Sequence, residues 1–202
     1  MSLFMTKKEI IWREILHQTI TNKKIAFTQK GLARDFGFSL STVFNALKIP
    51  RQIGAIKVTG RNFKMADAEK FLYLWATVRN LEKEIVYQTN VDASPKEIEG
   101  AMPPGVIFAC HSAYSQKYGE MPADYDKVYI YATSAQLAEI KKRFPFKNGY
   151  VNLIALRADS VLEKFGDTTP DVQTFADLWN LREWYAKEFL NALKQKLFIF
   201  VL

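Results

Sequence analysis

The chain has 202 residues, 49% of them hydrophobic, enough for one large domain or two smaller ones with separate cores. No apolar run approaches the roughly 20 residues of a membrane-spanning helix, and the N-terminus lacks a secretory signal pattern, so we expect a soluble cytoplasmic protein with no membrane partner. One cysteine and two histidines exclude an internal disulfide and zinc-finger spacing, so we expect neither metal nor cofactor.

The excess positive charge lies in the first third of the chain. Residues 1–65 carry 12 Lys and Arg against 3 Asp and Glu, a balance of +9, whereas residues 66–202 carry 16 against 18. A basic unit beside a slightly acidic remainder is typical of a module for a polyanion, because phosphate attraction supplies most sequence-independent affinity for nucleic acids. A solvated basic face without a partner is the alternative.

Two helices are predicted in the first 36 residues. Thr6 and Glu9 form a capping box, after which apolar residues recur at helical spacing as far as Ile20. The second helix is predicted over 29–36, and Gly37 ends it because glycine adopts the left-handed cap conformation at little cost.

A third helix is predicted to begin after Ser39, its N-cap. We expect Pro50 to end this helix near Ile49. Helix, glycine turn and helix is the arrangement that lays a second helix in the major groove of DNA. The side chains expected to face the core are Val43, Phe44 and Leu47, and those expected to contact bases or the groove are Ser41, Thr42, Asn45 and Lys48.

A β-hairpin follows the third helix. Two short β-type runs, 55–58 and 62–65, flank a glycine turn and predict a wing beside the DNA backbone. The order of these parts resembles a winged helix-turn-helix domain over residues 6–65, within a domain spanning 1–66. A protein-interaction module of the same shape is the alternative, because fold alone does not fix function. The residues expected to hold phosphates are Arg51, Lys57, Arg61 and Lys64.

A linker helix is predicted over 67–84, with apolar residues around almost its whole circumference. Such a helix is buried on more than one side, either between two domains or against its copy in a homodimer.

Strands and helices alternate in a third region, 85–202, which predicts a small α/β domain and an α+β chain overall. Strands are predicted over 85–89, 106–110, 127–132 and 150–156, helices from 94, over 111–119 and over 133–144, and one long helix after Pro170. We interpret Asp177, set among apolar residues of that last helix, as a packing residue, with a contact to a partner as the alternative.

Three stretches of this region carry a family resemblance. GVIFACHSAYSQKYGEMPADYDKVYIYAT, YVNLIAL and PDVQTFADLWNL are similar to the C-terminal domain of AbiEi-type antitoxins and regulators of type IV toxin–antitoxin systems. The glycine-arginine pair that often follows the last stretch is replaced here by residues 182–184. The resemblance covers nearly the whole chain and implies a degenerate nucleotidyltransferase-like fold, with a toxin as a partner.

The residues themselves test the enzymatic version of that fold. A working nucleotidyltransferase needs a Gly-Ser turn, an Asp-x-Asp pair on one strand and usually a third carboxylate, together holding two Mg²⁺. Here 110–112 lack the glycine, Asp124 and Asp126 lie in a turn ahead of their strand, and Asn152 offers only an amide. We therefore expect no catalytic residue, with a Mg²⁺-dependent transferase using the two aspartates as the alternative.

Cys110 and His111 are adjacent, which suggests a nucleophile and its base. On a strand such neighbours point to opposite faces, so we expect a core thiol and a polar neighbour instead. The sequence as a whole predicts a transcriptional regulator that binds double-stranded DNA, with an autoregulating antitoxin as its more specific form and an interaction scaffold as a further alternative.

Overall fold

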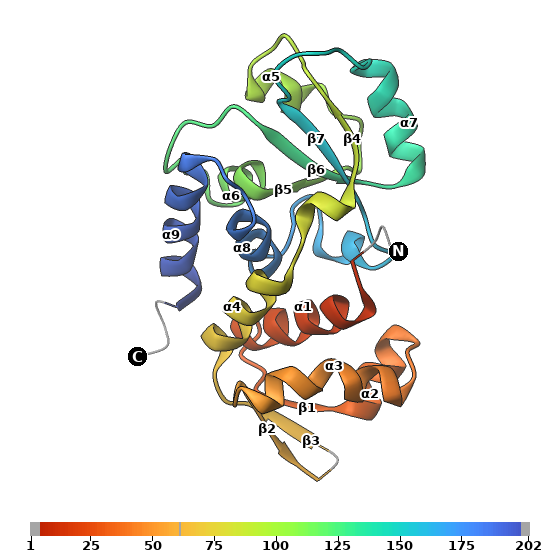
Figure 1. The fold of residues 1–202 in the computed structure, drawn as a ribbon, viewed down its shortest axis with the longest axis vertical. Helices are drawn as coiled ribbons and strands as arrows, with labels where there is room; N and C mark the ends of the chain where they lie inside the picture. Colours follow the sequence, from red (N-terminus) through yellow and green to blue (C-terminus); the bar gives the residue numbers. More distant parts are fainter. Residues whose placement is uncertain (1–4, 61, 199–202) are drawn as a thin grey trace. The chain divides into compact units, whose positions relative to one another are not determined.

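The computed structural model describes residues 5–60 and 62–198 (Figure 1). The α+β class expected from the sequence is confirmed, with two small separate sheets. The described chain divides into two compact units, residues 5–79 and residues 80–198. Within the described ranges, every helix is too short or too polar to cross a lipid bilayer.

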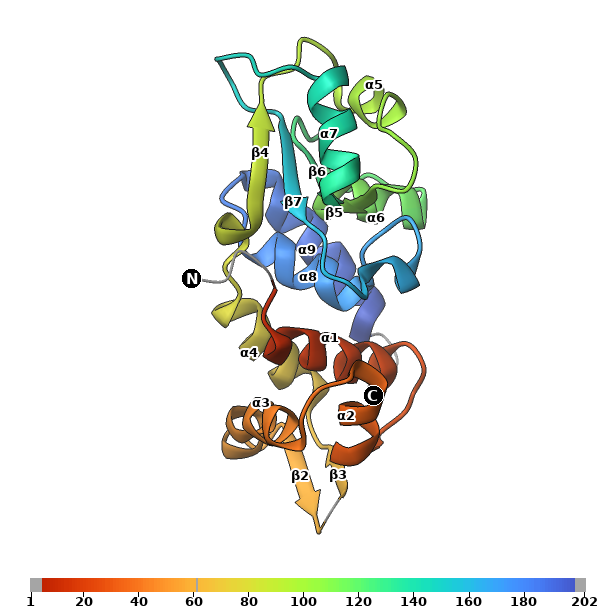
Figure 2. The same ribbon diagram turned by 90° about the vertical axis from the view of Figure 1, so that its right-hand side faces the viewer.

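The described part of the N-terminal unit holds four helices and a three-stranded antiparallel sheet in the order β1-β3-β2 (Figures 1 and 2). Phe27 and Phe63 face the core and stack across β1 and β3 with ring centres 5.4 Å apart, while their strand neighbours are exposed. This alternation leaves one face of the sheet to solvent. The elements are α1 (Lys7–Ile20), β1 (Ala26–Thr28), α2 (Gln29–Phe36), α3 (Leu40–Gln52), β2 (Ile56–Thr59), β3 (Asn62–Met65) and α4 (Ala68–Val78).

Helix α3 does not end before Pro50 as expected, but continues through it to Gln52. A proline inside a helix leaves the carbonyl four residues earlier without its donor. Here that carbonyl belongs to Ala46, and it accepts a hydrogen bond from the indole nitrogen of Trp12 on α1 at 2.7 Å. The long-range donor replaces the missing backbone bond, so the helix tolerates the proline.

The helix expected over 67–84 is shorter in the structure. Helix α4 ends at Val78, Arg79 is extended, and Asn80 caps a separate 3₁₀ turn, η1 (Leu81–Glu84). The buried Arg79 guanidinium lies 3.2 Å from the Glu9 carboxylate on α1. This ion pair fixes the end of α4 within the N-terminal unit, where its apolar face packs on α1 and Phe71 meets Trp12 edge to face.

The C-terminal unit contains a four-stranded sheet in the order β4-β7-β6-β5, in which β6 and β7 are parallel and the outer pairs antiparallel (Figure 1). The strand expected over 106–110 is shorter, because Cys110 already begins a helix. The elements are β4 (Ile85–Thr89), α5 (Pro95–Gly100), β5 (Ile107–Ala109), α6 (Cys110–Tyr118), β6 (Val128–Ala132), α7 (Ser134–Arg143), β7 (Leu153–Arg157), η2 (Leu162–Phe165), α8 (Asp171–Trp179) and α9 (Trp184–Phe198).

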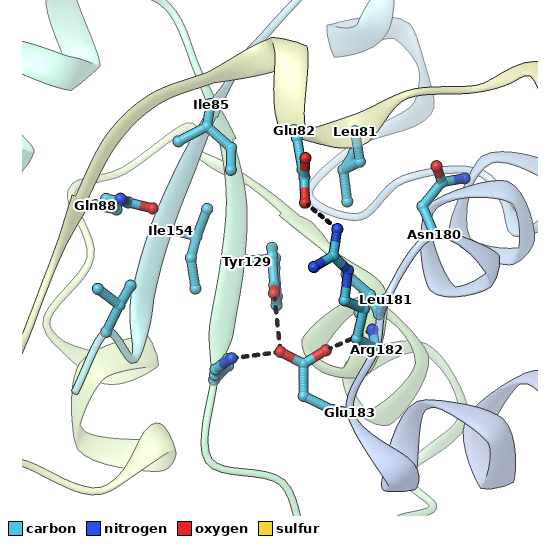
Figure 3. Close-up of a pocket in the computed structure, with 12 residues that line it drawn as sticks. Leu81, Glu82, Ile85, Gln88, Tyr129, Ile154, Asn180, Leu181, Arg182 and Glu183 are labelled. Carbon is cyan, nitrogen blue, oxygen red and sulfur yellow. Dashed lines mark hydrogen bonds and ion pairs between the residues drawn. The ribbon is translucent and has the colours of Figure 1, made fainter.

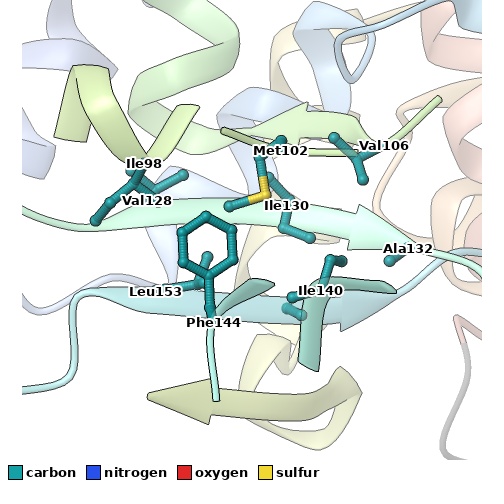
Figure 4. Close-up of a cluster of buried hydrophobic side chains, with 10 residues drawn as sticks. Ile98, Met102, Val106, Val128, Ile130, Ala132, Ile140, Phe144 and Leu153 are labelled. Atoms are coloured by element: carbon teal, nitrogen blue, oxygen red, sulfur yellow. The ribbon is translucent and has the colours of Figure 1, made fainter. Parts of the chain in front are cut away.

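Both faces of this sheet are covered. On one face, Ile130 and Leu153 pack with Ile98 of α5 and Ile140 of α7 in a buried apolar cluster (Figure 4). Alternate residues of the same strands point the other way, toward α6 and α8. Among them Tyr131 donates a hydrogen bond of 2.9 Å to the fully buried Asp177 of α8, as its interpretation as a packing residue requires.

The single long helix expected after Pro170 is two helices, α8 and α9. The break follows Asn180, whose side-chain amide donates to the carbonyl of Ala176 at 2.9 Å. Asparagine competes in this way with the backbone for helical hydrogen bonds. The amphipathic pattern continues across the break, so periodicity alone did not reveal it.

Candidate nucleic-acid interface

The exposed face of α3 carries three of the predicted contact residues. Ser41, Asn45 and Lys48 are all exposed, and their spacing of four and three residues aligns them along one side of the helix. Arg51 is exposed in the last turn of the helix, about 15 Å from Ser41 along the helix axis at 1.5 Å per residue. The helix therefore presents hydrogen-bonding groups near its start and a cation near its end.

The cap of α3 partly occupies the two hydroxyl residues that follow it. The Ser39 hydroxyl accepts the Thr42 backbone N–H at 3.1 Å and lies 2.9 Å from the hydroxyls of both Ser41 and Thr42. Thr42 is also half-buried, whereas Ser41 is exposed. Ser41 is thus better placed for a ligand than Thr42.

Two large apolar residues near the start of α3 are exposed. Phe44, predicted in the core, is 49% exposed, and Leu40 is 56% exposed. The buried residues of α3 are instead Val43, Ala46, Leu47 and Pro50, which follow the helical spacing i, i+3, i+4, i+7. Ala46 rather than Phe44 therefore faces the core. Leu40 and Phe44 line a hollow of about 560 Å³, which we call the α3 hollow, together with Gln29, Lys30, Ser41 and Gly60.

The α3 hollow links the helix to the turn of the β2–β3 hairpin. Gly60 has a φ of +62°, a conformation that favours glycine and suits the tight turn between paired strands. Arg61, predicted to hold phosphate from this turn, lies outside the described residues.

Two lysines of the hairpin face each other. The strand register sets Lys57 on β2 directly opposite Lys64 on β3, and both are exposed. Like charges in directly opposed positions destabilise a sheet. The hairpin thus holds two ammonium groups where an anionic ligand would relieve their repulsion.

The stretch that contains α3 and the hairpin has basic residues but no acidic residues of its own. From residue 36 to residue 66 the chain has five basic residues and no Asp or Glu. Glu9 is turned inward: burial alone raises its pKa, but the Arg79 guanidinium and hydrogen bonds from Thr6 and Trp75 lower the pKa below its ordinary value. The negative charge of Glu9 therefore lies inside the unit, next to the Arg79 guanidinium.

Asp126 of the C-terminal unit is held by two tyrosines. Asp126 accepts hydrogen bonds from the hydroxyls of Tyr150, at 2.6 Å, and Tyr185. Burial raises the pKa of Asp126, but these two hydroxyls and Lys127 lower it, so the group is an ionised acceptor. Among the described residues, no three His, Cys, Asp or Glu side chains form a group that could hold a metal ion.

Asn152, at the place of a third carboxylate, is also engaged in the fold. Its side-chain amide donates to the carbonyl of Val91 and accepts from the Val91 N–H, both at 2.8 Å. This two-point contact fastens the start of β7 to the segment after β4. The amide has a structural task that a carboxylate, which cannot donate, would not perform.

Cys110 and His111 are both fully buried at the start of α6, not on a strand as expected. The His111 ring lies against the rings of Tyr185 and Phe189, with centres 4.8 and 4.9 Å away. Burial lowers the pKa of His111 to about 4, despite the opposing influence of nearby carboxylates, so the imidazole is neutral at pH 7. Cys110 lies in the core as expected, whereas His111, expected to point to the opposite face, is buried as well.

A separate pocket of about 280 Å³ lies beside β4, β6 and β7 in the C-terminal unit (Figure 3). Its charged groups are paired: Glu183 contacts Lys127, and Arg182 lies 3.1 Å from Glu82. The Tyr129 hydroxyl is 3.5 Å from Glu183. The charged groups that line the pocket are thus balanced by partners within it.

Comparison of the chain with protein-family models, curated proteins and solved structures gives no match.

Proposed function

We propose that this protein is a DNA-binding transcriptional regulator whose N-terminal unit is a winged helix-turn-helix domain. In this proposal α3 enters the major groove and the β2–β3 hairpin lies beside the phosphate backbone. The observation that carries the proposal is the absence of Asp and Glu from the stretch 36–66, together with exposed cations on both elements. Opposed Lys57 and Lys64 support it, because a sheet without a polyanion gains nothing from that pair.

The exposed side chains divide into two roles. Asn45 reads a base edge, as its amide suits a bidentate contact with adenine, while Ser41 contributes a smaller contact in the same groove. Phosphates are held by the cations, which fix position without reading sequence. This second group comprises Arg51, Lys57, Arg61 and Lys64, while Lys48 contributes a groove contact beside Asn45.

The C-terminal unit, in the same proposal, has a nucleotidyltransferase-like arrangement without the chemistry. The tyrosine-bound Asp126 and the engaged amide of Asn152 support a structural use of these positions. We assign this unit to pairing two copies of the chain or binding a partner protein such as a toxin, in line with the antitoxin resemblance.

The test is fluorescence anisotropy with duplex from the gene's own upstream region and with scrambled duplex, at two salt concentrations. We expect tighter binding to the upstream duplex. Asn45→Ala should reduce that preference by about 1–3 kcal/mol. Lys57→Ala should instead weaken both duplexes alike and lower the salt slope by about one.

Lys70→Ala is the matched control, because Lys70 is an exposed lysine of the same unit on α4, outside the proposed surface. Absence of duplex binding at low salt would refute the proposal that the protein is a DNA-binding regulator. Equal losses on both duplexes for Asn45→Ala and Lys57→Ala would refute the division of roles.

A further inference from the structure

Exposed apolar side chains are an unusual feature at the start of a helix surrounded by cations. Leu40 and Phe44 occupy the first two turns of α3 and form the apolar part of the α3 hollow. Lys30 lines the same hollow, and the Lys48 ammonium lies 5.5 Å from the centre of the Phe44 ring. Whatever occupies the hollow must therefore offer apolar groups next to negative charge.

The major groove of DNA provides that combination at one kind of base pair. Thymine carries a 5-methyl group on the groove floor, flanked by phosphates on both sides, and apolar side chains contact it directly. Residues near the start of a recognition helix are those that reach base edges. Leu40 and Phe44 have this position, and no Asp or Glu occurs from residue 36 to residue 66, the stretch that contains α3 and the hairpin.

We infer that Phe44, with Leu40, selects thymine in the bound duplex by enclosing its 5-methyl group in the α3 hollow. The inference rests on the proposed function and adds to it the base feature that the protein reads. Amide contacts from Asn45 would read adenine, so the two residues together favour A·T pairs at neighbouring positions.

Replacement of thymine by deoxyuridine tests the inference, because it removes the methyl group and keeps base pairing. The probe is the tightest 20-base-pair duplex that the full-length protein selects from a random library, synthesised once with thymine and once with deoxyuridine. Wild-type protein should bind the thymine duplex about fourfold more tightly for each enclosed methyl group, the effect of one buried CH₂-sized group.

Phe44→Ala should bind both duplexes with nearly equal affinity, whereas Phe44→Leu should retain part of the preference. Because Phe44 is already half-exposed, its replacement leaves the core intact. Ile25→Ala is the control, since Ile25 is an exposed apolar residue of the same unit outside the hollow. The ratio of affinities for the thymine and deoxyuridine duplexes is measured for wild type and for each variant. Comparing these ratios between proteins cancels any effect of deoxyuridine on DNA shape, because that effect is common to all of them.

Each contrary outcome has a distinct meaning. Failure to select or bind any duplex refutes the proposed function together with the inference. Equal affinity of wild-type protein for both duplexes refutes the thymine contact while DNA binding stands. A third outcome is that Phe44→Ala binds both duplexes like wild type but changes the oligomeric state in sedimentation. The hollow would then bind a second copy of the chain, and the inference would be refuted.

Discussion

At the scale of single residues, Glu9 shows how far local sequence information reaches. Its capping box with Thr6 follows from a spacing of three residues and is confirmed by hydrogen bonds in both directions. The same carboxylate also receives Arg79, 70 positions along the chain. No local pattern predicts that pairing, because it depends on how α1 and α4 pack.

Glu9→Gln should lower the free energy of unfolding at pH 7 by about 3 kcal/mol, because it removes the carboxylate charge that lies 3.2 Å from the buried Arg79 guanidinium. The folded-state pKa of Glu9 lies below its unfolded value of 4.5, so this stabilisation is present above pH 4.5 and is lost as the pH falls through the folded-state pKa. Urea unfolding at pH 7 and pH 3 measures both effects.

Glu14→Gln, a change at a half-buried carboxylate of the same helix, provides the control and should have a smaller effect. A Glu9→Gln deficit of the same size at both pH values would show that the ion pair does not carry the stabilisation.

At the scale of elements, the sequence predicted the order of helices and strands better than their ends. The strands over 85–89 and 62–65 lie where alternation places them, and Gly37 ends α2 in the left-handed conformation. The end of α3 could not be predicted, because the donor that compensates for Pro50 is Trp12 on another helix. The prediction that Phe44 is buried was also wrong. Phe44 is hydrophobic, but its position around α3 places it on the exposed side of the helix.

Trp12→Phe should destabilise the N-terminal unit by about 1–3 kcal/mol, because the buried Ala46 carbonyl then lacks a donor. Adding Pro50→Ala supplies a backbone N–H for that carbonyl and should recover part of the loss. Thermal unfolding of wild type, both single variants and the double variant measures the coupling. Purely additive effects would show that the indole and the proline act independently.

At the scale of the whole molecule, the two units differ in charge: the excess of basic residues lies in the first third of the chain, and the remainder is slightly acidic. The division of charge is visible in the sequence, and so is the surface of polar and basic residues on α3 and the hairpin. The state of Asp126 is not, since Tyr150 and Tyr185 reach it from distant parts of the chain.

Asp126→Ala should lower the thermal stability of the chain, because two tyrosine hydroxyls lose their acceptor. Its affinity for DNA should stay within about twofold of wild type, since the proposed contacts lie in the N-terminal unit. Neither protein should transfer label from a nucleoside triphosphate in the presence of Mg²⁺. Transfer by wild type that disappears in Asp126→Ala would instead establish the transferase alternative.

The opposed lysines of the hairpin carry a last consequence, for the effect of ionic strength. Salt screens the repulsion between Lys57 and Lys64, so it should make the free protein harder to melt. In the proposed complex with DNA, the same ions would compete with the protein for phosphates and weaken binding. The same pair of lysines therefore predicts opposite effects of salt on two quantities. Salt should raise the stability of the free hairpin and lower the affinity of the hairpin for DNA.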